Sequence, residues 1–471
     1  MKKEKKKPVE LKWDPDHPKP VTRRDFIAQG LAAGYAISMT PSILFSMFRS
    51  EMAMAQTASC SPVANPLGLI PLLVQDHVGG IGLSSNFLVK NSSGAFLNSY
   101  STLGIPDGNR PTSAPSQVDT TFGAPMHATL SQFLLGMKSI MSPEAIANTR
   151  IMTVCHTSQD DTGANALSPL IMATKAGLQG SVLKQGLGNF NPPAGGRSSS
   201  PVLDGALKPM IVNSGDALVK TLKMGEALNA TTFPIAAKLK IADAAKRLSA
   251  GQLQKFQAMD QGSQFSTLLS EGYLKNLDLI YCADSLNAAS NPFVTQLYGA
   301  EATSAKAAVV FNALQGFTGP GAYVIDGCDY HNRGQAVSDA KDFEAGRELG
   351  RTLELAKRLG KPVAVAGISD GAIDYASGER TPQSDGGTKS MSFLACYKPG
   401  GPPTLNNNQI GAFTSGQVVD TSFYFAQSPS IAACILFANY LQICGKISLL
   451  DANIPAGMIT AAQRPGILGF G

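Results

Sequence analysis

The pattern that most constrains the fold is a strand, a helix and a second strand within residues 321–369. GAYVIDG (321–327) is a short apolar run typical of a buried strand. DAKDFEAGRELGRTLELAKRLG (339–360) carries apolar residues at helical spacing, and Gly360 ends it before KPVAVAGIS (361–369), a second buried strand. Such a crossover makes the two strands parallel, so their carboxyl ends lie at the same edge of a sheet.

Other apolar segments alternate between strand and helix patterns along the chain. This alternation predicts an α/β fold with a mixed, mostly parallel central sheet and helices on both faces. SIAACILFANYLQIC (430–444) is apolar on nearly all sides but too short to span a bilayer, so it predicts a buried helix. The remaining predicted elements are strands at 67–75, 150–156 and 207–215 and helices at 128–141, 166–177 and 236–283.

Two polar loops follow the strands of the 321–369 unit, and both contain possible metal ligands. The first, DGCDYHNRGQ (326–335), contains Asp326, Asp329 and His331. Asp329 and His331 are two positions apart, so in an extended chain both side chains point to one face. A carboxylate and an imidazole suit zinc, manganese or iron.

The second loop, SDGAIDY (369–375), offers Ser369 and Asp370 from the neighbouring strand end, where open α/β sheets place their sites. An alternative interpretation is that both loops are ordinary polar turns, because Asp, Asn and Gly are common in turns.

Polar segments rich in Gly, Pro, Ser and Asn separate the predicted elements. Loops of this length in a compact domain are usually functional or mobile. They lie at 97–124, 186–204, 374–390 and 397–409.

The amino-terminal segment 1–55 has the pattern of a twin-arginine export signal. A charged stretch precedes TRRDF (22–26), an apolar stretch follows as far as Phe48, and AMAQ offers a cleavage site after Ala55. This predicts a signal at 1–55, a single large domain at 56–471, the export machinery as partner, and a periplasmic or secreted location. The alternatives are an uncleaved signal that anchors the protein in the membrane and a lipoprotein modified at Cys60, although TASC (57–60) lacks the large aliphatic residue expected three positions before that cysteine.

Charge and cysteine content exclude several classes of protein. The chain has 39 basic and 34 acidic residues. The segment 1–55 contains 10 of the basic and 6 of the acidic residues, which leaves 29 basic and 28 acidic residues in the rest of the chain. This near balance argues against a nucleic-acid partner or a polybasic membrane surface. The cysteines form no CxxC pair, so neither a zinc ribbon nor a cysteine cluster is indicated. They are Cys60, Cys155, Cys282, Cys328, Cys396, Cys434 and Cys444.

Four short segments lie in sequence order at VGGIGLSSNF (78–87), GCDYHNRGQ (327–335), ISDGAID (368–374) and SDGGTKS (384–390). In order and spacing they resemble the motifs of the domain of unknown function 1501 family, which groups secreted bacterial relatives of alkaline phosphatases and arylsulfatases. The segment 327–335 resembles the family's Gly-x-Asp-Thr-His-x-x-Gln loop, and 368–374 resembles its strand ending in Ser-Glu-Phe-Gly-Arg. The segment 384–390 stands where a Gly-Thr-Asp-His-Gly loop belongs, and 78–87 where a Gly-Gly-x-Asp-Gly turn belongs.

The resemblance implies an alkaline-phosphatase-like fold that binds a divalent metal. Carried over to this chain, the ligands are Asp329, His331, Asp370 and Asp385, and Ser369 or Ser84 is a possible nucleophile. The chain departs from the pattern where Ile81 replaces an Asp, Gly386 replaces a His, and Phe-Gly-Arg is missing after Asp370. His77 and His156 could contribute ligands or serve as structural hydrogen-bonding residues.

Three functions are therefore compatible with the sequence. The first is an exported protein on an alkaline-phosphatase-like scaffold, with a degenerate metal site, that binds an unknown component of the cell envelope. The second is a metal-dependent hydrolase of small phosphate or sulfate esters, which needs a full set of ligands to activate a nucleophile. The third is a redox protein that carries a cofactor, although no Gly-rich dinucleotide motif supports it.

Overall fold

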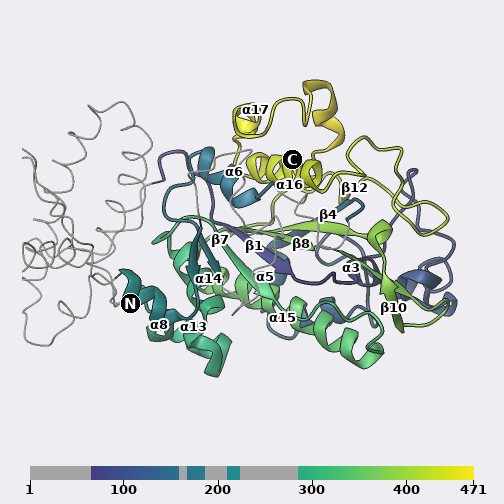
Figure 1. Ribbon diagram of the computed structural model, residues 1–471, viewed down its shortest axis with the longest axis horizontal. Helices are drawn as coiled ribbons and strands as arrows, with labels where there is room; N and C mark the ends of the chain where they lie inside the picture. Colours follow the sequence, from purple (N-terminus) through teal and green to yellow (C-terminus); the bar gives the residue numbers. More distant parts are fainter. Residues whose placement is uncertain (1–64, 159–166, 186–208, 223–284, 370) are drawn as a thin grey trace, which may run out of the picture. The chain divides into compact units, whose positions relative to one another are not determined.

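The computed structural model describes residues 65–158, 167–185, 209–222, 285–369 and 371–471 (Figure 1). All of them belong to one compact unit that spans residues 59–471. The export signal at 1–55, the loop at 186–204 and the helix at 236–283 lie outside the described residues and stay predictions. Within the described residues, no helix has the length and apolar character needed to cross a bilayer.

An eight-stranded sheet forms the centre of the fold, in the order β12-β4-β11-β8-β1-β7-β5-β6. Only β11 runs antiparallel to its two neighbours, and every other pairing in this sheet is parallel. This confirms the predicted mixed, mostly parallel sheet. The strands are β1 Leu72–His77, β4 Thr149–Cys155, β5 Leu183–Gln185, β6 Met210–Val212, β7 Gly321–Ile325, β8 Val363–Ser369, β11 Met391–Tyr397 and β12 Gln409–Ile410.

The predicted crossover unit is confirmed, and β1 lies between its two strands. Helix α15 (Gln335–Arg358) connects β7 to β8, and both strands pair with β1 in parallel. His77, at the end of β1, is in register with Ile325 of β7 and Ser369 of β8. Three strands therefore end level with one another, and their loops emerge at one edge of the sheet.

Helices cover both faces of the sheet, as predicted (Figure 1). Val363 and Val365 of β8 face the core beneath α4 (Gln132–Lys138), α14 (Ala305–Gln315) and α15. Ala364 and Ala366 face the opposite core, formed with α6 (Pro169–Lys175) and α16 (Pro429–Ile443). The other helices are α3 Leu83–Asn86, α5 Pro143–Ala147, α8 Gly215–Leu222, α13 Pro292–Tyr298 and α17 Leu450–Asn453.

Glycines allow α4 and α15 to approach closely on the first face. A Cβ atom at Gly346 would lie 1.9 Å from the carbonyl oxygen of Phe133, and one at Gly136 would lie 2.2 Å from that of Phe343. Since real Cβ atoms essentially never come so close, the packing of these helices requires glycine at both positions.

The bounds of several elements differ from prediction for local reasons. The first strand begins at Leu72 rather than at residue 67, since Pro71 has no N–H to donate to a neighbouring strand. The helix predicted at 128–141 begins only after Ser131, whose hydroxyl accepts a hydrogen bond from the Leu134 N–H as an N-cap. The apolar segment at 430–444 is confirmed as a buried helix, α16.

Candidate metal centre

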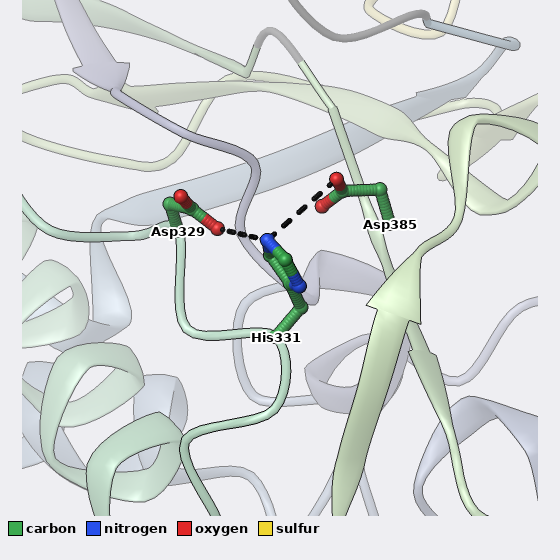
Figure 2. Close-up of side chains that lie close together, drawn as sticks. All are labelled: Asp329, His331 and Asp385. Atoms are coloured by element: carbon green, nitrogen blue, oxygen red, sulfur yellow. Dashed lines mark ion pairs between the residues drawn. The ribbon is translucent and has the colours of Figure 1, made fainter.

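Asp329 and His331 lie in the loop after β7 and point toward the same space (Figure 2). The Nε2 atom of His331 is 2.9 Å from Oδ1 of Asp329. Tyr330, between them, points the other way and is completely buried. The two side chains therefore share one face of the loop, as predicted, although the backbone there is turned rather than extended, because the Tyr330 N–H donates to the Cys328 carbonyl oxygen at 2.9 Å.

Asp385 reaches the same space through a hairpin that follows β8. The hairpin consists of β9 (Ile373–Tyr375) and β10 (Pro382–Asp385), and Asp385 pairs with Ile373. Its Oδ2 atom lies 3.8 Å from Nε2 of His331 (Figure 2). Partial burial raises the pKa of Asp385, and the neighbouring carboxylates of Asp329 and Asp374 raise it further while His331 lowers it.

One ligand atom from each of Asp329, His331 and Asp385 lies within 4.8 Å of the other two. Two carboxylates and an imidazole match the oxygen and nitrogen preferences of zinc, manganese and iron, whose ligand bonds are about 2 Å long. The side chains are 52, 33 and 40% exposed for Asp329, His331 and Asp385, so an ion could enter from solvent. The donor set therefore fits a divalent transition metal with positions open to a further ligand.

Asp370 and Asp326 were also predicted as ligands of the site. Asp370 lies outside the described residues. Asp326 is exposed, does not belong to the cluster, and accepts a hydrogen bond from the Gly327 N–H.

The two predicted nucleophiles lie inside the fold. The Ser369 hydroxyl accepts hydrogen bonds from the backbone N–H groups of Ile81 and Gly371 and lies 3.5 Å from the carbonyl oxygen of His77. Ser84 is fully buried in α3. Neither serine is positioned as an exposed nucleophile beside the cluster.

The other histidines in the described residues are buried, and Nε2 of His77 has no hydrogen-bond partner there. The ring of His77 is buried and its Nδ1 donates to the carbonyl oxygen of Ile368, while burial lowers its pKa to about 4. His156 is also buried with a pKa lowered to about 4, and its Nε2 contacts the Ser392 hydroxyl. His127 accepts hydrogen bonds at Nδ1 from the N–H groups of Thr129 and Leu130. His331 is therefore the histidine suited to bind a ligand in this part of the chain.

Gly79 and Gly80, after β1, pack against two loops: the one that contains Asp329 and His331, and the one that follows β8. Sequence reasoning missed this packing role. Gly79 has a φ of +97°, and a Cβ there would lie 2.4 Å from Cβ of Asp329. Gly80, with a φ of +89°, packs in the same way against the backbone of Gly371 and Ala372. Two adjacent glycines in a left-handed conformation indicate such a close backbone approach.

A buried carboxyl group, that of Asp342, anchors the loop that contains Asp329 and His331. Sequence reasoning did not predict this contact. Asp342 of α15 is fully buried and accepts hydrogen bonds from the Tyr330 hydroxyl and the Asn86 amide, each at 2.7 Å. The Tyr330 oxygen in turn accepts a hydrogen bond from the Gly82 N–H. Burial raises the pKa of Asp342 to about 7, although both hydrogen bonds and Arg380 act to lower it.

The five cysteines in the described residues are all free, and four of them are buried.

No family model, curated protein or solved structure matches this chain. The resemblance to the domain of unknown function 1501 family therefore remains a hypothesis from the four sequence motifs.

Proposed function

We propose that this protein is an exported binding protein on an alkaline-phosphatase-like scaffold, which holds one divalent transition-metal ion between Asp329, His331 and Asp385. The convergence of three ligand atoms from two loops, within 4.8 Å and open to solvent, carries this proposal. A bound ion would supply Lewis-acid attraction for an anionic oxygen of an envelope component.

The protein's own residues would orient such a ligand at the edge of the sheet. Asp329 and His331 are fixed relative to each other because the intervening Tyr330 is anchored to Asp342. Asp385 comes from the β9–β10 hairpin, which is tied to the domain by the ion pair between Asp374 and Lys389 at 2.6 Å. Ligands supplied by two separately anchored loops favour a preformed site.

The surroundings of the two candidate nucleophiles favour binding over ester hydrolysis. Phosphatases of the implied type need a nucleophile activated next to the metal. Ser369 is engaged by backbone groups, and Ser84 is buried. We therefore expect no turnover of p-nitrophenyl phosphate or p-nitrophenyl sulfate with zinc or manganese added. Turnover by the wild type that disappears in the Asp329→Ala, His331→Ala variant would instead establish the hydrolase alternative.

Elemental analysis of protein purified from an export-competent host tests the metal site directly. We expect about one zinc, manganese or iron ion per chain in the wild type, as in other sites with three protein ligands. The double variant Asp329→Ala, His331→Ala should lose the ion while retaining its circular dichroism spectrum. Asp326→Ala is the matched control, because this exposed carboxylate belongs to the same loop but not to the cluster. Wild-type protein that contains no metal and binds none when it is added would refute the proposal.

A further inference from the structure

A polar cavity of about 620 Å³ that opens to solvent is lined by the segment 402–408, away from the candidate metal centre. Lys90, Gly123 and Arg150 form the rest of its lining. Arg150 of β4 pairs with Cys396 of β11, and Cys396 pairs on its other side with Ala364 of β8. Arg150 is therefore level with the amino end of β8. The metal centre follows the opposite, carboxyl end of that strand, so the two sites are separate.

The cavity wall is held in place by backbone hydrogen bonds. The N–H groups of Asn406 and Asn407 donate to the carbonyl oxygen of Gly469, and Thr153 donates to that of Asn408. Gly123 has a φ of +91°, and a Cβ there would lie 2.3 Å from a methyl carbon of Leu405. Backbone hydrogen bonds therefore hold the segment against the domain, and the positive φ of Gly123 favours glycine at the position that Leu405 contacts.

Two cations line this cavity without a carboxylate partner among the described residues. Nζ of Lys90 donates to the side-chain oxygen of Asn408 at 3.1 Å, and burial lowers the pKa of this lysine. Nη1 of Arg150 donates to the carbonyl oxygens of Ala147 and Thr149, and within the described structure Nε and Nη2 have no hydrogen-bond partner. Guanidinium donors of this kind match carboxylate and phosphate oxygens.

The rest of the lining indicates which anions fit. It contains three asparagines, 406–408, whose amides can bond to hydroxyl groups, and the described part of the chain places no acidic or aromatic residue in it. Its volume suits a small molecule, while the lack of an aromatic side chain gives no platform for stacking a base or ring. We infer that the cavity under 402–408 binds a small polyhydroxylated anion, such as a uronic acid or a sugar phosphate, through Lys90 and Arg150.

Isothermal titration calorimetry tests this inference on the full chain carrying Asp329→Ala and His331→Ala, so that no anion binds through the proposed metal site. The ligands are glucuronate, glucose 6-phosphate and neutral glucose. We expect at least one of the two anions to bind about tenfold or more tightly than glucose, because hydrogen bonds to charged groups are the stronger ones. The preferred anion distinguishes a carboxylate source from a phosphate source.

Variants of the cavity cations connect binding to this site. Lys90→Gln and Arg150→Gln should each weaken binding of the preferred anion about tenfold. Arg150→Lys should have a smaller effect, because lysine keeps the positive charge but lacks the paired N–H donors of the guanidinium group. Lys446→Gln, a cation outside the cavity, should bind as the parent does. If Arg150→Gln does not fold, Lys90→Gln decides the question. Equal binding of anions and glucose, or anion binding unchanged in both glutamine variants, would overturn the inference.

Discussion

Two sets of acidic side chains lie on opposite sides of one loop, and they have different roles. Asp329 and Asp385 are exposed and converge on His331, whereas Asp342 is fully buried and bonded to Tyr330 and Asn86. Exposed carboxylates contribute little to stability but can exchange water for a ligand. A buried carboxyl group must be hydrogen-bonded, and its removal leaves its partners unsatisfied. The comparison separates the proposed ligand-binding residues from the neighbouring residue that anchors the loop.

The largest effect should come from removing the buried carboxyl group. Asp342→Ala leaves the Tyr330 hydroxyl and the Asn86 amide without their acceptor, so we expect the free energy of unfolding to fall by about 3 kcal/mol. Urea denaturation measures this change. Glu344→Ala is the control on the same helix, because its ion pair with Lys341 is partly exposed and should contribute less than about 1 kcal/mol. Equal effects of the two variants would show that Asp342 is not an anchor.

The pH dependence of stability should identify the same carboxyl group. In the folded protein its pKa is raised from the ordinary 3.8 to about 7, so the protonated form is favoured by folding. Its stabilising contribution is full below pH 4 and is lost as the pH rises through 7. The stability difference between wild type and Asp342→Asn should therefore be larger at pH 5 than at pH 8, by about 2 kcal/mol.

The comparison of wild type with Asp342→Asn removes the contributions of other groups. Buried His77 and His156 have lowered pKa values, so they reduce stability as the pH falls, but they do so in both proteins. Arg380, Asp339 and Tyr330 near Asp342 are likewise unchanged. A difference that stays constant between pH 5 and pH 8 would contradict the assignment.

A smaller loss of stability, with a clear loss of metal binding, should follow Gly79→Ala. The new Cβ would meet the backbone and Cβ of Asp329, and the φ of +97° is itself strained for alanine. We expect about 2 kcal/mol of destabilisation and weaker zinc or manganese binding. Gly94→Ala separates the two causes, because Gly94 has a φ of +79° but nothing within 4 Å of the added atom. It should lower stability by about 1 kcal/mol and leave metal binding intact.

The smallest effect on stability should come from replacing an exposed carboxylate of the proposed metal site. Asp385→Asn is expected to change the free energy of unfolding by less than about 0.5 kcal/mol. It should nevertheless weaken zinc or manganese binding about tenfold or more, because it replaces a charged ligand. Equilibrium dialysis measures the affinity, and Asp326→Asn is the control. Unchanged affinity in Asp385→Asn would remove this residue from the site.

The sequence predicted the sheet and the common face of Asp329 and His331 because both follow from local patterns. Apolar runs and the crossover helix specify parallel strands, and the spacing of Asp329 and His331 specifies a common face. Asp385 was placed in the site only through a family resemblance, since its approach depends on how the β9–β10 hairpin folds back. Asp342 was not predicted, because an acidic residue on an amphipathic helix gives no sign that it is buried. Gly79 was noted only as part of a motif position, although two adjacent glycines after a strand are a usable signal of close backbone packing.

The central position of β1 has a consequence for how the protein is made. Leu73 pairs with Gly321 and Leu72 pairs with Ala364, so both partners of this strand come far later in the chain. The middle of the sheet therefore cannot assemble on the ribosome until most of the polypeptide has been synthesised. Pairings over such distances in sequence are slow to form. A transport route that accepts the completed tertiary structure, as the predicted twin-arginine signal implies, would give this chain the time to fold before it leaves the cytoplasm.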